Sequence, residues 1–304
     1  YSTNLDSAAI LAEVILVKSK EAGYTLGQAK GEFATGHVAY LKGKREYAVP
    51  HFLKALDIYR PLKGNDPLID QANICITLGK IYRQNHMLDM AIEFYEQGIE
   101  YALECNNEEA LRKLLYNQSV AYRRNGDIDK ALDAVTQSMN FILEGDTAIK
   151  QRTYNQFGVI YYDLEEYDQA REWYNKMIQL DSAKPSPKYY RAQAYHNIAI
   201  SYQLQSNFAM AWVYYKLALK EKELLGNTEK LFITLRDMAE LALLENRKDT
   251  ALNYAHKALV LIEQVPKTPE NYNLYLTLSE CVQESNPVKA LFYAKQYISE
   301  TKAF

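Results

Sequence analysis

The sequence has few cysteines, no long apolar run and little net charge, and each shortage excludes a class of protein. Cys75, Cys105 and Cys281 are odd in number, widely spaced and without a CxxC pair, which argues against a disulfide framework or a zinc site. No run of about 18 apolar residues occurs, so we expect no membrane insertion within this chain. The formal net charge is −3, with both signs mixed along the chain. This charge pattern predicts no nucleic-acid binding.

Motifs for catalysis and metal binding are missing as well. The sequence contains no phosphate-binding loop, nucleophile elbow or HExxH motif. No two of its five histidines are spaced i, i+4, as metal ligands on one helix face would be. We therefore predict that the protein is not an enzyme, and that it has no catalytic residue, metal site or cofactor.

The chain has ample material for a folded core, since 48% of its 304 residues are hydrophobic. It begins at Tyr1 without a methionine and shows no signal peptide. We expect a fragment of a longer protein. Its localisation stays open between the cytoplasm, which suits free thiols, and the periplasm.

An alanine recurs at intervals of 39 to 43 residues and marks an internal repeat. The series is Ala8, Ala48, Ala91, Ala131, Ala170, Ala211, Ala251 and Ala290. Small residues precede it by twelve positions, namely Gly36, Gly79, Ser119, Gly158, Ala199 and Ala239. Aromatic residues follow it by four positions in several copies, namely Phe52, Tyr95, Tyr174 and Tyr215. Two antiparallel helices that cross closely need small side chains at the crossing and aromatic side chains beside it, so each copy predicts a helix pair.

The pattern resembles the tetratricopeptide repeat (TPR), best seen in Phe-Gly-Val-Ile-Tyr-Tyr (157–162) followed by Tyr167, Ala170 and Tyr174. The period near 40 differs from the usual 34 and is similar to the long repeats of TPR peptide receptors and of the sensing regions of bacterial TPR-containing histidine kinases and regulators. The resemblance implies an all-α fold, a right-handed α-solenoid (superhelix) of tandem helix-turn-helix repeats in one domain, 1–304. The expected repeats are 1–25 (partial), 26–65, 68–106, 108–145, 148–183, 188–226, 228–265 and 270–304.

The first helices of such repeats line a concave groove, which is the default binding site. If the small residue is numbered position 8, position 6 carries an amide in three consecutive repeats: Asn117, Gln156 and Asn197. In peptide-binding TPR relatives an asparagine at this position holds the peptide backbone, and the resemblance implies the same role here. Further groove residues are predicted from the same helix face: Asn73, Lys80, Arg83, Lys113, Tyr116, Arg152, Asn155, His196 and Arg236. Their excess of basic side chains favours an acidic protein or peptide segment as partner.

Two functions remain open from the sequence. The first is a protein- or peptide-binding module, the ligand- or partner-sensing region of a bacterial signalling or regulatory protein. The alternative is a structural scaffold or oligomerisation module that self-associates through outer helix faces and uncapped ends. Ile10, Leu11 and Val14 in the incomplete first repeat favour the alternative, because an uncapped repeat leaves apolar surface without a partner.

Overall fold

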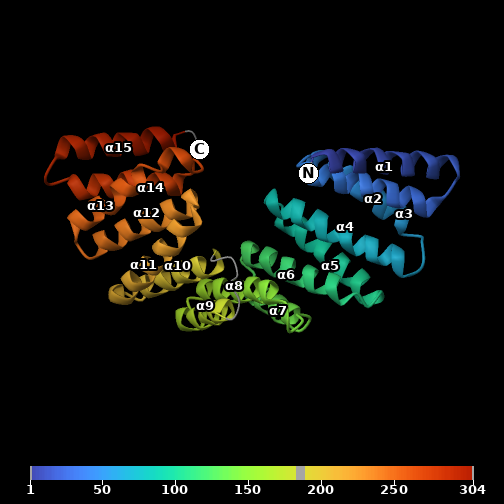
Figure 1. Cartoon of the computed structure of the whole chain (residues 1–304), viewed down its shortest axis with the longest axis horizontal. Coiled ribbons are helices and arrows are strands. Elements are labelled where there is room, and N and C mark those ends of the chain that lie inside the picture. The colour runs from blue at the N-terminus through green and yellow to red at the C-terminus, as the bar shows by residue number, and fades with distance from the viewer. Residues whose placement is uncertain (1, 183–188, 303–304) are drawn as a thin grey trace. The chain divides into compact units, whose positions relative to one another are not determined.

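The computed structural model describes residues 2–182 and 189–302, and over these ranges the chain is built of α-helices, one short 3-10 helix and no strand. Figure 1 shows the helices in chain order. The chain divides into two compact units, Tyr1–Gln156 and Phe157–Phe304, which we call the N-terminal and C-terminal units. The boundary lies inside helix α8 (Thr147–Asp163).

The N-terminal unit consists of α8 up to Gln156 and the seven preceding helices, and consecutive helices from α1 to α7 pack against each other. These are α1 (Ser2–Glu21), α2 (Thr25–Leu41), α3 (Arg45–Tyr59), α4 (Asn65–Gln84), α5 (Leu88–Glu104), α6 (Glu108–Asn125) and α7 (Ile128–Met139). The first helices of neighbouring pairs, α4 and α6, also contact each other directly. Side chains on these two helices can therefore form one surface.

The C-terminal unit repeats this arrangement from Phe157 onward, and its consecutive helices from α9 to α15 pack in the same way. They are α9 (Tyr167–Ser182), α10 (Tyr189–Leu204), α11 (Phe208–Leu225), α12 (Thr228–Leu244), α13 (Lys248–Leu259), η1 (Ile262–Gln264), α14 (Pro269–Val282) and α15 (Pro287–Thr301). The predicted all-α fold is confirmed. The predicted union of all repeats in one superhelical domain stays a prediction.

The recurring alanines form the core of the second helices. Ala48, Ala91, Ala131, Ala170, Ala211 and Ala251 are fully buried, and Ala290 is nearly so. Ala8, in the incomplete first repeat, is only half-buried. The three cysteines are buried and free, as the sequence predicts.

The small residue at position 8 makes room for the aromatic ring of the following helix. A Cβ atom added to Gly79 would lie 2.3 Å from Cε1 of Tyr95, and one added to Gly158 would lie 2.4 Å from Cε1 of Tyr174. Both rings are buried. The close approach is thus between a backbone and a ring, which explains why the two positions vary together along the sequence.

Six helix pairs, from α2–α3 to α12–α13, have a residue with left-handed backbone in the turn, seven positions after the small residue. The φ angles run from 57° to 90° at Gly43, His86, Gly126, Glu165, Ser206 and Asn246. Four of these six residues carry a side chain, which costs about 1 kcal/mol or more in this conformation. The tight helix pair therefore imposes this backbone even where the local sequence disfavours it.

Candidate functional site

Cations gather on the first-helix faces of the N-terminal unit. Helical spacing places Lys80 and Arg83 on one face of α4, and α6 adds Lys113, Tyr116 and Asn117. Arg152 of α8 completes what we call the basic cluster: Lys80, Arg83, Lys113, Tyr116, Asn117 and Arg152. A cleft of about 340 Å³ opens here, lined by Lys80, Glu109, Arg112, Lys113, Tyr116, Asn117, Ile149, Arg152 and Thr153. The cleft thus brings together most of the residues predicted for this unit, namely Lys80, Lys113, Tyr116, Asn117 and Arg152.

The basic cluster carries positive charge that the one carboxylate of the cleft lining does not neutralise. Burial lowers the pKa of Lys80, and repulsion from Arg152, Arg83 and Lys113 lowers it further. One residue of the cleft lining is acidic, Glu109, and it pairs with Lys113 at 2.6 Å. An anion bound in the cleft would relieve this repulsion, so the electrostatics favour an acidic ligand.

The side-chain amide of Asn117 makes its hydrogen bonds within the protein. It is 6% exposed, its Oδ1 accepts from Arg83 at 3.4 Å, and its Nδ2 donates to the carbonyl of Lys113 at 2.7 Å. Tyr116 lies under Arg152, with 5.1 Å from the guanidinium carbon to the ring centroid. Lys113, Tyr116 and Arg152 therefore present more surface to a ligand than the amide predicted as the centre of the site.

The remaining predicted residues of this unit lie outside the cleft lining. Asn73 is half-buried on α4. Asn155 and Gln156 lie on α8, and the Oδ1 atom of the former and the Nε2 atom of the latter are buried with no hydrogen-bond partner among the described residues. Gln156 is the last residue of its unit and Asn197 belongs to the other. A continuous row of amides through Asn117, Gln156 and Asn197 therefore stays a prediction.

In the C-terminal unit, Arg236 is held by internal contacts. Its guanidinium donates to Asp237 at 2.8 Å, to the carbonyl of Glu270 at 3.1 Å and to Oδ1 of Asn271 at 3.3 Å, which ties α12 to α14. His196 is buried, with Nε2 lying 3.3 Å from Oδ2 of Asp237. A ligand contact by Arg236 remains a prediction, and its observed role is to join two helices.

His196 and Asn197 line a second hollow, together with residues that the sequence reasoning missed. Chief among these is Lys222, which is buried near the end of α11. A signal was present in the sequence, because Lys222 continues the spacing of Ala211, Tyr215 and Ala218, where an apolar residue is expected. The lysine interrupts an apolar stripe and so differs from a solvated surface charge.

Neither a metal cluster nor a membrane-spanning helix is present in the described ranges. Within residues 2–182 and 189–302, no group of three or more His, Cys, Asp or Glu side chains is placed to hold a metal ion. In the same part of the chain, none of the helices has the length and apolar character needed to cross a membrane.

Comparison with known proteins identifies the repeat. Residues 150–223 and 72–105 each match a family model described as tetratricopeptide repeat. Among curated proteins, the photosystem I assembly protein Ycf3 of Prochlorococcus marinus is 24% identical over 126 residues, which are 41% of this chain and 68% of that protein.

Solved structures share the fold over most of the chain. The apo form of RapI has a TM-score of 0.73 at 15% identity and covers 99% of this chain and 84% of its own. The apo form of the quorum sensor NprR from B. thuringiensis has a TM-score of 0.70 at 16% identity, with 94% and 80% covered. A signal transduction ATPase with a tetratricopeptide repeat sensor from Pyrococcus horikoshii gives 0.74 at 15% identity, with 96% of this chain but 44% of that one covered.

Helix pairs with the alanine, small-residue and aromatic register define a helical-repeat protein. The two family models assign tetratricopeptide repeats to residues 72–105 and 150–223, and the fold of the chain is similar to that of solved tetratricopeptide repeat proteins.

Proposed function

We propose that this protein binds an acidic protein or peptide segment at the basic cluster of its N-terminal unit. The observation that carries the proposal is the convergence of Lys80, Lys113 and Arg152 around a cleft whose lining has one acidic residue, with Arg83 close enough to Lys80 to repel it. Carboxylates would form charge-assisted hydrogen bonds there, and the Tyr116 ring offers an apolar surface between them.

We also infer that binding serves a sensory role in a bacterial signalling or regulatory protein. The support is likeness in fold to a quorum sensor and to the repeat sensor of a signal transduction ATPase. The full-length gene product tests this inference, because a sensor requires an output domain or a partner that carries one. A full-length product without either would contradict it.

Binding is tested with peptides of matched length whose net charge runs from acidic to basic, measured by fluorescence anisotropy. The variant Lys113→Glu with Arg152→Glu should weaken binding of the acidic peptides roughly tenfold or more, because two attractive contacts become repulsive. The matched control is Lys30→Glu with Lys63→Glu, which makes the same charge change at exposed lysines outside the cleft lining. Equal losses in both double variants would mean nonspecific attraction and would contradict a site at the basic cluster.

A scaffold function keeps one specific observation in its favour. Helix α1 exposes Ile10 (65%), Leu11 (60%), Val14 (42%) and Val17 (47%). Exposed apolar side chains of this kind on one helix favour contact between copies of the chain. Sedimentation velocity over a range of concentrations tests it, and Leu11→Lys should then shift the distribution toward monomer. A wild-type protein that stays monomeric throughout would remove the scaffold alternative.

A further inference from the structure

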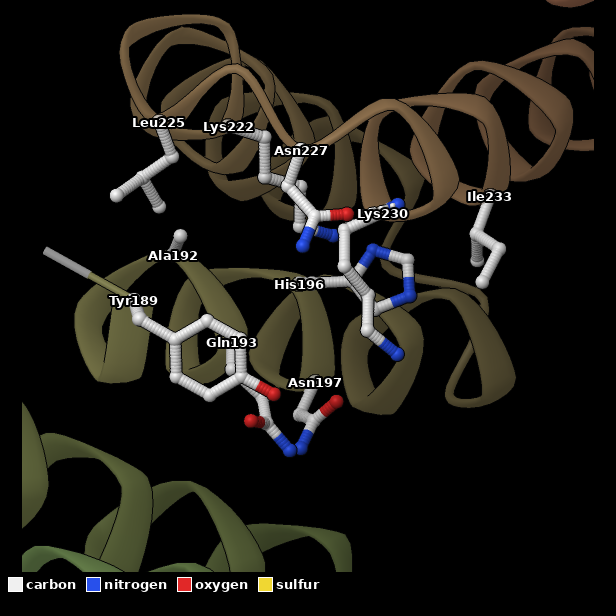
Figure 2. Close-up of a pocket in the computed structure, with 10 residues that line it drawn as sticks. All are labelled: Tyr189, Ala192, Gln193, His196, Asn197, Lys222, Leu225, Asn227, Lys230 and Ile233. Carbon is white, nitrogen blue, oxygen red and sulfur yellow. Dashed lines mark hydrogen bonds between the residues drawn. The ribbon is translucent and has the colours of Figure 1, made fainter. Parts of the chain in front are cut away.

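A small hollow in the C-terminal unit lies between α10, the end of α11 and the start of α12. We call it the Lys222 pocket. In Figure 2, α10 supplies one side and α11 with α12 the other. Its lining residues are Tyr189, Ala192, Gln193, His196, Asn197, Lys222, Leu225, Asn227, Lys230 and Ile233. Its volume is about 220 Å³, below the 300 Å³ or more of typical small-molecule sites. It suits a ligand of the size of one amino-acid residue.

The floor of the pocket holds an amine with no anionic partner. Lys222 is 4% exposed, and its Nζ donates to Oγ1 of Thr234 at 2.5 Å. An ammonium has three N–H donors, and no second acceptor or ion-pair carboxylate is found for Lys222 among the described residues. A buried ammonium in this condition is costly unless an anion joins it.

The nearest acidic group is already neutralised. Thr234 links Lys222 to His196, whose Nδ1 lies 3.3 Å from the threonine hydroxyl, and His196 faces Asp237 with Nε2. Asp237 in turn receives the guanidinium of Arg236 at 2.8 Å. Burial lowers the pKa of His196, and Asp237 offsets part of this effect, so the ring is neutral. The negative charge of Asp237 is therefore balanced by the guanidinium of Arg236.

The charged groups facing Lys222 therefore leave the pocket positive. The charged groups that act on Lys222 are Lys230 and Asp237 on α12, and the neutral ring of His196 on α10 also lies near it. Lys230 lines the pocket as well, and its charge lowers the pKa of Lys222 after the larger effect of burial. The pocket combines two amines with a neutral imidazole and no acidic lining residue.

Aliphatic side chains complete the lining at the two ends of the pocket. Ala192 and Leu225 lie at one end and Ile233 at the other (Figure 2). Gln193, Asn197 and Asn227 add amides that can pair with a peptide backbone. Amines, amides and an aliphatic end in one residue-sized space match a carboxylate that carries an aliphatic side chain.

We propose that the Lys222 pocket binds such a carboxylate, with Lys222 and Lys230 donating to its oxygens and with Ala192 and Leu225 in contact with its aliphatic group. The C-terminal residue of a peptide and a free aliphatic acid share this chemistry. The site is separate from the basic cluster and does not depend on the function proposed for it.

The test uses three probes in isothermal titration: acetyl-Gly-Gly-Leu with a free carboxylate, the same tripeptide as its carboxamide, and 4-methylpentanoate. The free-acid tripeptide should bind at least about tenfold more tightly than the carboxamide. Tighter binding of the tripeptide than of 4-methylpentanoate identifies a peptide C-terminus as the source. Equal binding of the two identifies a small acid.

Lys222→Met keeps the length of the side chain and removes its amine, so it should weaken carboxylate binding by about tenfold or more. Lys220→Met, at an exposed lysine two residues away, is the matched control and should bind as the wild type does. The variant Lys113→Glu with Arg152→Glu should also keep carboxylate binding, which separates this site from the basic cluster. Lys230→Met gives a second variant at the pocket. Because Lys230 is partly exposed, this substitution should change the stability of the fold less than Lys222→Met does.

Three results would overturn the proposal. They are no saturable binding of either acid at millimolar concentration, carboxamide binding as tight as that of the acid, and unchanged affinity in both pocket variants.

Discussion

The buried amine of Lys222 should make the stability of the C-terminal unit depend on pH. The side chain is 4% exposed, with one hydrogen bond to Thr234. Burial lowers its pKa to about 7, with a further lowering by Lys230 and a partial offset by Asp237. Lys222→Met should abolish the part of the pH dependence that this amine causes.

The direction of the pH dependence is set by the number of protons that Lys222 binds in the folded and unfolded chains. Between pH 7 and the ordinary lysine value of 10.5, the unfolded chain holds a proton on Lys222 that the folded chain lacks. Stability therefore rises with pH through this window, by about 1.4 kcal/mol per pH unit. The wild type should gain about 2 kcal/mol from this group between pH 7 and pH 9, because the folded chain still holds part of the proton near pH 7. Methionine binds no proton in either state, so the variant should lack this gain.

The assay is urea unfolding followed by tryptophan fluorescence. Both tryptophans of the chain, Trp173 and Trp212, lie in the C-terminal unit, so the signal reports that unit alone. The free energies of unfolding of wild type and Lys222→Met should converge as the pH rises from 7 to 9, with Lys220→Met following the wild type. A difference between wild type and Lys222→Met that stays constant over this range would refute the account of a desolvated amine.

Three further substitutions test the packing of the repeats in the same unit, each by urea unfolding. Gly158→Ala should destabilise by about 1–2 kcal/mol, because the new Cβ would lie 2.4 Å from the Tyr174 ring and the gain in helix propensity offsets only part of the overpacking. Glu165→Gly should stabilise by about 1 kcal/mol, because φ is 61° at this turn. Arg236→Met should destabilise by about 3 kcal/mol, because Asp237 is left buried without its guanidinium.

Each of these substitutions has a matched comparison. Gly145→Ala, in the N-terminal unit, adds a Cβ where no atom lies within 4 Å, and should leave stability nearly unchanged when unfolding is followed by far-UV circular dichroism. Glu172→Gly, at an exposed site within α9, should destabilise by about 1 kcal/mol, opposite in sign to Glu165→Gly. Adding Asp237→Asn to Arg236→Met should recover part of the loss. The packing account fails if the two glycine substitutions have the same sign or if Gly158→Ala is neutral.

The helix pairs could be predicted from the sequence because their packing rule is periodic. Gly79 and Tyr95, or Gly158 and Tyr174, stand sixteen residues apart and touch within one repeat. Gly36 and Phe52 make the same kind of contact, so one sequence displays it three times. The structure gives the reason for this spacing: the aromatic ring occupies the space that a side chain on the glycine would need.

The candidate sites were predicted less well because they depend on contacts between repeats. The helix face of Lys113 and Arg152 followed from helical spacing, and the cleft brings them together. The hydrogen-bond partners of Asn117 could not be predicted in this way, since one is Arg83 on a neighbouring helix and the other is the backbone carbonyl of Lys113. Lys222 lies on a second helix and lines a hollow with the first helices of two repeats, so a search restricted to first-helix faces excluded it.

Position 6 of the repeat shows how one sequence position acquires two uses. Asn117 accepts a hydrogen bond from Arg83 on the preceding first helix, and Asp237 is bound by His196 on the preceding first helix of its own unit. In both cases the polar residue connects adjacent repeats, and its burial follows from that contact. Asn197 has no such bond among the described residues, is only half-buried and borders the Lys222 pocket. A position-6 side chain is free to meet a ligand where the preceding repeat leaves it unbound, and of these three residues that condition is met by Asn197.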